Sequence, residues 1–288
     1  MIPDLARDLA VTGIGAATTG ADPTAFLRQR KLRKFMGRQD DMAVTAAAQA
    51  LQSAGITGSL GDRCGLYMAV GYIPFETADI NRLLDASLED GRFSMRRFAV
   101  DGFGAINPLL TFRVLPNMPA FHVSLNFDLQ GPYCVSYPGA GQFYAALEEA
   151  FAALQSGAID MALVGAVADQ ENGLVEHHFS RLAPPVHPSR LSNAAAFLVV
   201  ERHADSIRRG APARATLVDY RFEYAPADPF EGAPASECLA RDGVCLNDPR
   251  HLGPVSLASA LAHTSAARLT HALQTSDGFR AASAWEVA

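Results

Sequence analysis

The residues that could perform nucleophilic chemistry gather where an expected strand, residues 131–137, meets an expected helix, residues 141–156. A helix N-terminus carries positive potential and free N–H groups, which favour a thiolate and lower the pKa of a thiol. The nearest thiol, Cys134, falls inside the strand, so we expect it to point into the sheet or an interface as a structural cysteine. Ser136 and Tyr137 have no evident base near them in the sequence. The junction could activate a nucleophile, but none of these residues clearly fills that role.

The histidines do not indicate a catalytic or metal-binding site either. His122 falls in what we interpret as an apolar strand, which favours a core or interface histidine, and His263 is interpreted as a helix-surface residue. His177 and His178 lie in an expected loop without a second ligand cluster, so no zinc site is predicted. The four cysteines lack CxxC spacing, suit a reducing cytoplasm and indicate no metal or other cofactor. These cysteines are Cys64, Cys134, Cys238 and Cys245.

Composition and charge exclude several classes of protein. Hydrophobic residues make up 49% of the 288 residues and charged residues 19%, which is enough apolar side chain for a sizeable core. The net charge of −6 and the absence of a long basic run argue against nucleic acid, and the basic residues 28–34 are interpreted as a solvated surface segment. Residues 1–8 lack an apolar signal core, and no stretch approaches the roughly 20 apolar residues that span a bilayer. We therefore expect a cytoplasmic protein without membrane insertion.

The pattern of the first 220 residues predicts alternating strands and helices. Met42, Ala46 and Ala50 share one face of an expected helix that Gly55 is placed to end. The expected helices cover residues 40–54, 141–156 and 204–209, and the expected strands cover residues 9–15, 64–71, 131–137, 160–168, 194–201 and 213–220. Strands that alternate with helices are typical of an α/β protein with a central sheet.

The remaining segments carry weaker signals. Residues 75–105 are polar and are interpreted as loop or cap with short helical pieces, whereas residues 108–127 are rich in apolar and aromatic side chains. Residues 223–254 are predicted to be loop, residues 256–273 one helix and residues 280–288 a final strand. We divide the chain into an N-terminal part, 1–220, and a reduced, loop-rich C-terminal part, 221–288.

Five segments resemble segments of β-ketoacyl synthases, and they follow the order of that family. One is Arg38-Gln-Asp-Asp-Met-Ala-Val-Thr-Ala-Ala-Ala-Gln-Ala-Leu-Gln-Ser-Ala-Gly-Ile56, similar to the helix before the second strand of these enzymes. The others are residues 107–118, 122–132, 155–166 and 201–220. The resemblance implies the thiolase-like α/β fold, with a complete N-terminal half and a truncated C-terminal half.

In that family the nucleophilic cysteine lies at a strand-to-helix turn within a Thr-Ala-Cys-x-Ser-Gly-like sequence. The matching stretch here is Val135-Ser-Tyr-Pro-Gly-Ala-Gly-Gln-Phe-Tyr144. An ungapped match between Gly131 and Gly157 puts Ala140 at the nucleophile position, and a slip of one residue puts Gly139 there. Neither side chain can attack a thioester.

Other features of the turn fit the same loss. Pro138 suits the first turn of a helix, because its missing N–H has no intrahelical partner there. Chain-length factors of polyketide synthesis often carry glutamine in place of the cysteine, but Gln142 falls two positions past that place and is interpreted as a polar residue of the first helical turn. The family's His-Gly-Thr-Gly-Thr motif is absent, and the loop of active enzymes is reduced to residues 187–195. We therefore predict no catalytic residues.

The resemblance implies a non-catalytic, chain-length-factor-like subunit. It would form a heterodimer with an active β-ketoacyl synthase and limit the length of that partner's acyl tunnel. It would meet the acyl carrier protein only indirectly. The short form most resembles the proteins of polyene, and especially aryl polyene, synthesis. Two alternatives stay open: a decarboxylase or acyltransferase of this fold that uses Cys134 or Gln142, and a purely structural stabiliser of a ketosynthase. The expected partner interface is the strand Gly131, Pro132, Tyr133, Cys134, Val135, Ser136 and Tyr137, and the tunnel candidates are Leu110, Phe112, Leu115, Met118 and Phe127.

Overall fold

A computed structural model of the chain describes residues 8–182, 185–225, 236–246, 250–275 and 278–288. The expectation for the charged N-terminal segment falls largely on residues 1–7, outside the described residues. Parts of the expected C-terminal loop, residues 226–235 and 247–249, lie outside them as well.

Most of the strands join one ten-stranded sheet, and two short ones form a separate hairpin. The bounds in chain order are β1 Leu9–Thr18, β2 Cys64–Val70, β3 Leu88–Glu89, β4 Arg92–Phe93, β5 Tyr133–Ser136, β6 Met161–Ala168, β7 Ala194–Arg202, β8 Ala215–Tyr224, β9 Ser236–Arg241, β10 Val244–Leu246, β11 Arg268–Gln274 and β12 Phe279–Val287.

The order of the large sheet, β10-β9-β11-β12-β8-β1-β7-β6-β2-β5, contains the same arrangement twice. Numbered from one to five within each half, the strands run 1-5-4-2-3 from β1 to β5 and again from β8 to β10. The halves meet where β1 pairs antiparallel with β8, with Ala10 opposite Thr216. The C-terminal residues therefore supply a full second set of five strands, an internal repeat that the sequence pattern did not reveal.

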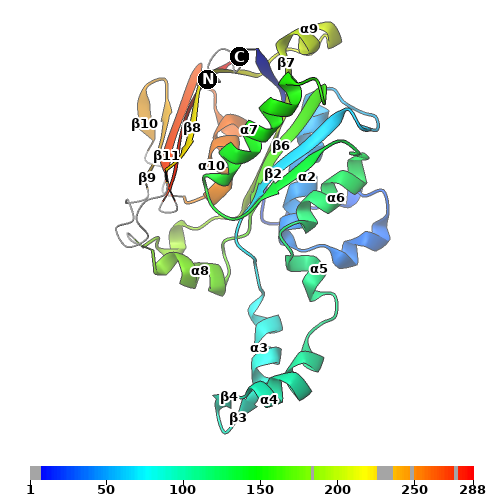
Figure 1. The fold of residues 1–288 in the computed structure, drawn as a ribbon, viewed down its shortest axis with the longest axis vertical. Coiled ribbons are helices and arrows are strands. Elements are labelled where there is room, and N and C mark those ends of the chain that lie inside the picture. Colours follow the sequence, from blue (N-terminus) through cyan, green and yellow to red (C-terminus); the bar gives the residue numbers. More distant parts are fainter. Residues whose placement is uncertain (1–7, 183–184, 226–235, 247–249, 276–277) are drawn as a thin grey trace.

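The helices cover the first half of the sheet on both faces. Their bounds are α2 Arg38–Ser53, α3 Thr77–Ala86, α4 Met95–Arg97, α5 Leu110–Val114, α6 Met118–Phe127, α7 Gln142–Gln155, α8 Gly173–Ser180, α9 His203–Arg209 and α10 Ser256–His263, with 3₁₀ turns at Thr24–Phe26, Arg30–Phe35, Phe103–Ala105, Pro188–Arg190 and Gly253–Val255 and a π-turn at Phe98–Gly102. Helices α2 and α6 pack on one face of the first half, and α7 and α10 lie on the other (Figure 1).

Two apolar cores follow from this layering. The larger core joins α7 and α10 to strands of both halves, and includes Phe143, Leu257, Leu198 and Trp285. The second core packs α2 and α6 against the first half of the sheet. In α7 the side chains of Phe143, Leu147, Phe151 and Leu154 recur at helical spacing and are all buried, and Gly157 at φ 70° provides the left-handed residue that ends this helix.

An arm projects from the body between β2 and α6. It consists of α3, the β3–β4 hairpin, α4, the turns that follow it and α5, and its tip lies far from the sheet (Figure 1). The sequence had suggested a polar loop or cap at residues 75–105. The structure confirms the short helical pieces, but the arm carries many exposed apolar side chains.

Two predictions beyond residue 220 are wrong. Residues 236–246 form the β9–β10 hairpin instead of loop, because Asp242 and Gly243, both at positive φ, supply a two-residue hairpin turn. The single helix expected over 256–273 ends at His263, and β11 follows, because its side chains alternate between buried and exposed. The final strand is confirmed as β12, and the division at residue 220, which falls inside β8, stays a prediction.

Among the described residues, no helix is both long enough and apolar enough to cross a bilayer.

Candidate functional site

The turn between β5 and α7 is the site to which the sequence pointed. Strand β5 ends at Ser136 and α7 begins only at Gln142, so Pro138 lies before the helix and not in its first turn as predicted. Gly139 adopts φ 109°, a conformation that side chains other than glycine rarely take, and this bend delays the helix. Its carbonyl accepts a hydrogen bond from the Gln142 N–H at 3.3 Å.

The side chains at this turn are chemically inert. Ala140 is half-buried and packs against the larger core, and Gln142 is half-buried at the first position of α7. Residues 138–142 contain no thiol and no hydroxyl. Cys134 is half-buried in β5 and also packs against the larger core, so its thiol points into the layer between the two halves. Within residues 138–142 no side chain could attack a thioester.

Aromatic residues from the C-terminal part close over the turn. A Cβ built on Gly141 would lie 2.7 Å from the Phe279 Cβ, so the backbone of the turn touches the start of β12. The Phe279 ring stacks on Phe222, with centroids 5.5 Å apart and planes 5° from parallel. The surface that faces the turn here is therefore apolar.

A buried polar network lies one helical turn further along α7, and the sequence did not predict it. The Tyr144 hydroxyl lies 2.9 Å from both His271 Nδ1 and Ser283 Oγ, and the Trp285 indole N–H donates to Ser283 at 2.9 Å. On its other side the His271 ring meets Glu237 at 2.8 Å. These partners come from β9, β11 and β12, so the network ties α7 to the second half of the sheet.

The electrostatics of this network are those of a structural element. Burial raises the pKa of the Tyr144 hydroxyl, which keeps it neutral. Burial alone would raise the pKa of Glu237, but the hydrogen bond and charge of His271 outweigh it and lower that pKa overall. Tyr144 and His271 are almost completely buried, at 0% and 2% exposed, so the pair has no access to a substrate.

Three histidines that were expected in a strand or a loop lie in helices instead. His122 lies in α6, because the apolar run around it is long and periodicity cannot separate a buried strand from a buried helix. It is fully buried, and neither ring nitrogen makes a close hydrogen bond to a described residue. Burial lowers the pKa of the ring to about 4, an effect that the Phe35 backbone partly opposes. His177 and His178 belong to α8, and the His178 ring packs 4.2 Å from that of Tyr72. His263 is exposed at the end of α10, as predicted for a helix-surface residue.

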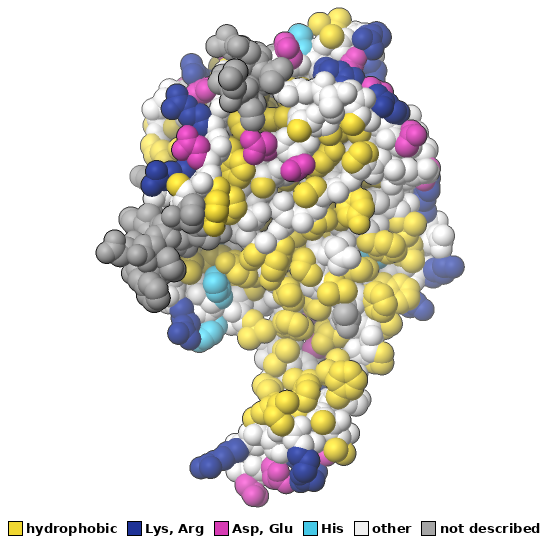
Figure 2. All heavy atoms as spheres, in the orientation of Figure 1, with side chains coloured by type: hydrophobic (Ala, Val, Ile, Leu, Met, Phe, Trp, Pro, Cys, Tyr) yellow, Lys and Arg dark blue, Asp and Glu magenta, His cyan; other side chains and the backbone are white. Residues whose placement is uncertain are grey.

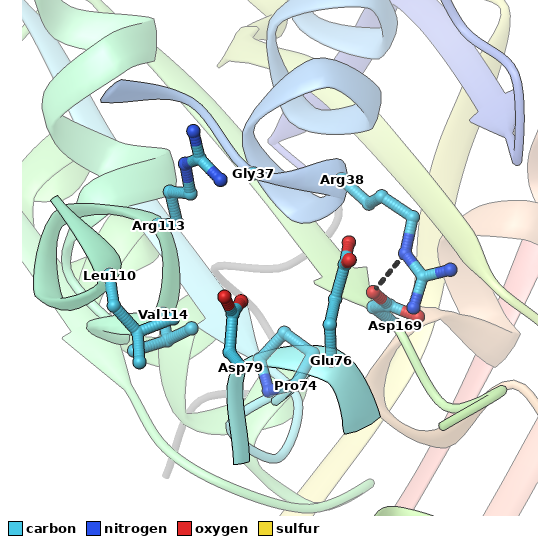
Figure 3. Close-up of a pocket in the computed structure, with 9 residues that line it drawn as sticks. All are labelled: Gly37, Arg38, Pro74, Glu76, Asp79, Leu110, Arg113, Val114 and Asp169. Atoms are coloured by element: carbon cyan, nitrogen blue, oxygen red, sulfur yellow. Dashed lines mark hydrogen bonds and ion pairs between the residues drawn. The ribbon is translucent and has the colours of Figure 1, made fainter. Parts of the chain in front are cut away.

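A small polar cavity lies where the arm leaves the body (Figure 3). The carboxylates of Glu76 and Asp79, at the start of α3, point into it between Arg38 of α2 and Arg113 of α5. Arg38 forms an ion pair with Asp169 at 2.8 Å. Burial raises the pKa of Asp169, an effect that the Arg38 charge partly opposes. The cavity is lined by charge, so it does not suit an acyl chain.

The comparisons with known proteins agree with this architecture. A family model described as the N-terminal domain of β-ketoacyl synthases matches residues 6–198, about two thirds of the chain. The chain belongs to the β-ketoacyl synthase family. The matched region contains the β5–α7 turn and the arm, and it covers the first half of the sheet up to a point inside β7.

Solved structures extend the likeness to the second half of the fold. The complex AntDE:AntF, a type II polyketide synthase acyl-carrier protein with its ketosynthase, aligns with a TM-score of 0.71 at 13% identity, over 97% of this chain and 99% of that one. The ishigamide ketosynthase/chain length factor aligns with a TM-score of 0.65 at 18% identity, over 98% and 99%. A β-ketoacyl synthase from Burkholderia phymatum STM815 aligns with a TM-score of 0.58 at 20% identity, over 78% and 66%. At these identities the likeness establishes the shared thiolase-like fold.

The predicted interface strand lies at an edge of the sheet. Among the described strands, β5 has one neighbour, β2, with which it pairs in parallel, and Tyr133 at its start is 72% exposed. The backbone groups on its other side face away from the sheet. This placement is what pairing with a second molecule would need, and the role itself stays a prediction.

Four of the five tunnel candidates lie in α5 and α6, and Leu115 lies between these helices. Among the described residues, the five do not line one cavity. Leu110 and Met118 are buried, and Phe127 is half-buried against the second core. Phe112 is 45% exposed and meets Phe35 edge to face at 5.5 Å, and Leu115 is also exposed. Only Leu110 reaches the polar cavity of Figure 3.

The sequence did not predict that the apolar side chains of the arm are exposed, because they are scattered among polar residues. Val100 and Phe103 are 71% and 69% exposed, and yellow side chains cover much of the arm in Figure 2. A surface of this kind on a projecting segment is typical of a contact site for another protein. The exposed apolar residues of the arm are Leu84, Leu88, Phe93, Met95, Val100, Phe103, Phe112 and Leu115.

Proposed function

We propose that this chain is a non-catalytic, chain-length-factor-like subunit that pairs with an active β-ketoacyl synthase and bounds its acyl tunnel. The β5–α7 turn carries the proposal, because it corresponds to the family's nucleophile position and holds Pro138, Gly139, Ala140 and Gly141. A condensing enzyme without a nucleophile cannot form the acyl-enzyme thioester that starts its reaction.

Two surfaces support the need for a partner. The edge strand β5 offers unpaired backbone groups, and the arm presents an apolar surface to solvent. Both features are costly in an isolated molecule, since an open edge and a large apolar patch favour association. An active ketosynthase of the same fold would offer a matching edge strand across a pseudo-two-fold axis.

The ishigamide protein is described as a ketosynthase/chain length factor, and AntDE:AntF as a ketosynthase with its acyl-carrier protein. By analogy, we place this chain in type II polyketide synthesis in the cytoplasm, with aryl polyene synthesis as the pathway and an acyl carrier protein as an indirect partner. The exposed Phe112 and Leu115, at the base of the arm, would complete a tunnel wall only when the partner is present.

Co-expression with a ketosynthase encoded beside it tests the proposal. We expect a stable one-to-one complex that condenses acyl thioesters, whereas the lone chain condenses none. Efficient condensation by the purified lone chain, lost on changing Cys134 or Gln142, would favour a decarboxylase or acyltransferase instead.

Product length separates a chain-length factor from a structural stabiliser. Phe112→Ala in the complex should shift the product distribution towards longer chains, because a bulky side chain at the tunnel wall is removed. Ile207→Ala on the distant helix α9 is the matched control, since Ile207 is also exposed. Unchanged products for all five tunnel candidates would refute the tunnel role and leave a stabiliser.

The nucleophile position can be tested directly. Ala140→Cys restores a thiol to the turn, but the turn then faces the stacked rings of Phe222 and Phe279 and no catalytic histidine motif. We expect the variant to remain inactive in condensation when no partner is present. Condensation by this variant would mean that the rest of the catalytic apparatus is intact.

A further inference from the structure

The β9–β10 hairpin brings two cysteines together at the edge of the sheet opposite β5. Six residues lie between Cys238 and Cys245 in the sequence, and the Sγ atoms of the two cysteines lie 2.8 Å apart. Asp242 and Gly243, at φ 48° and 81°, form the tight turn between the strands. Cys245 pairs with Ala240, so Cys238 and Cys245 stand diagonally on one face of the hairpin.

Both thiols are open to reagents, unlike the other two cysteines of the chain. Cys238 and Cys245 are exposed, whereas Cys64 is buried in β2 and burial raises the pKa of its thiol to about 12. Cys134 is half-buried against the larger core. The chain therefore has one accessible pair and two shielded single thiols, a contrast that predicts site-selective oxidation.

We propose that Cys238 and Cys245 form a reversible redox site, in which a small disulfide such as oxidised glutathione converts the two thiols into an intramolecular disulfide. One thiolate attacks the glutathione disulfide, forms a mixed disulfide and releases one glutathione thiolate. The second cysteine then attacks the protein sulfur of the mixed disulfide, forms the Cys238–Cys245 bond and releases the second glutathione. Two protein thiols are oxidised and one glutathione disulfide is reduced to two thiols, because the two protons that leave the cysteine thiols are taken up by the two glutathione thiolates.

Hairpin geometry favours the second step over accumulation of the mixed disulfide. The strands already hold the two sulfur atoms in contact, so ring closure requires little backbone movement. A sulfur raised to high local concentration displaces glutathione faster than a second glutathione thiol can. The pKa of the Cys238 thiol is raised by its hydrogen bond to Cys245, so we expect oxidation to quicken as the pH rises and more thiolate forms.

The bond would act on the stability of the sheet edge. β10 pairs only with β9, and β9 also carries Glu237, the partner of His271 in the buried network. A covalent link between β9 and β10 restricts the unfolded chain and fixes this edge. This inference does not depend on the proposed function, because the hairpin lies outside the β5–α7 turn and the arm.

The test uses the full chain in glutathione buffers of stepped ratio, with alkylation after unfolding and peptide mapping by mass spectrometry. We expect oxidising buffers to leave Cys64 and Cys134 alkylated, while the peptides of Cys238 and Cys245 become joined and lose two hydrogen atoms. Cys238→Ser should instead hold a glutathione adduct on Cys245. Glutathione adducts on both cysteines of the wild-type chain, free thiols throughout, or cross-linked chains would each overturn the proposal.

A thermal melt provides a second readout. The oxidised wild-type chain should melt at a higher temperature than the reduced chain, and added reductant should reverse the shift. The variant with both Cys238→Ser and Cys245→Ser keeps the hairpin polar groups and controls for effects of oxidant elsewhere. An equal shift in that variant would mean that the effect arises outside the hairpin.

Discussion

The backbone of Gly141 faces Phe279 so closely that a Cβ built on the glycine would lie 2.7 Å from the Phe279 Cβ. A Cβ atom is fixed to the backbone and cannot swing away, so Gly141→Ala forces the β5–α7 turn and β12 apart. We expect a loss of about 1–3 kcal/mol in the free energy of unfolding, the range for overpacking a core. Urea denaturation of the purified chain measures it.

Gly173→Ala is the matched control, because a Cβ at Gly173 meets no atom within 4 Å. Its stability should equal or slightly exceed that of the wild type, since alanine is the better helix former and Gly173 opens α8. Equal stability of both alanine variants would contradict the close approach of β12 to the turn.

The Tyr144 hydroxyl provides the second prediction. Tyr144→Phe keeps the ring stacked near Phe222 but removes the group that joins His271 Nδ1 to Ser283 Oγ. A buried ring nitrogen is then left without its partner, which costs about 1–3 kcal/mol. Tyr133→Phe on the exposed start of β5 is the control. If it lowered the free energy of unfolding as much as Tyr144→Phe does, the buried network would not explain the effect.

The first half of the fold was predictable because its signals are long and regular. α2, α7, β2 and β6 follow from helical periodicity or from apolar runs bounded by glycine. The β5–α7 turn also followed from the sequence, because glycines bound the strand and the helix on either side of it, whereas the assignment of the nucleophile position to Ala140 or Gly139 stays a prediction. The start of α7 did not follow from the sequence, since the bend at Gly139 depends on a positive φ that the sequence only permits.

The second half was harder to predict for physical reasons. β9, β10 and β11 are short, and the Asp242–Gly243 turn between β9 and β10 was the local signal that went unused. The contact between Tyr144 and His271 joins residues 127 positions apart, so no local pattern encodes it. The repeated strand order likewise depends on which strands pair with one another, and this pairing leaves no short-period repeat in the sequence.

Burial of His122 predicts a dependence of stability on pH. The folded ring has a pKa of about 4 and the unfolded ring a pKa near 6.5, so the unfolded chain binds more protons between these values. His122 therefore does not lower the free energy of unfolding above pH 6.5, and this free energy falls as the pH drops from 6.5 towards 4. The loss amounts to roughly 3 kcal/mol at the lower end of this range.

His122→Leu removes the titrating group, whose ring nitrogens make no close hydrogen bond to a described residue. We expect the variant to unfold with a flatter pH profile than the wild type when both are compared between pH 7.5 and 4.5. The difference between the two profiles isolates His122 from buried acids such as Asp41, whose pKa is raised to about 6 by burial. Parallel profiles for the two proteins would contradict the buried, neutral histidine.

The last prediction concerns the binding of a partner to the apolar arm. Val100→Asp and Phe103→Asp place a charge on side chains that are 71% and 69% exposed, so the lone chain should change in stability by no more than about 0.5 kcal/mol. If a ketosynthase covers the arm, each variant loses the burial of one apolar side chain, about 1.5–3 kcal/mol, and binds the partner roughly 10- to 100-fold more weakly. Ile207→Asp, 65% exposed on α9 at the other end of the molecule (Figure 1), is the matched control and should bind as the wild type does. Biolayer interferometry with the immobilised ketosynthase measures all three, and unaltered binding of both arm variants would mean that the arm lies outside the interface.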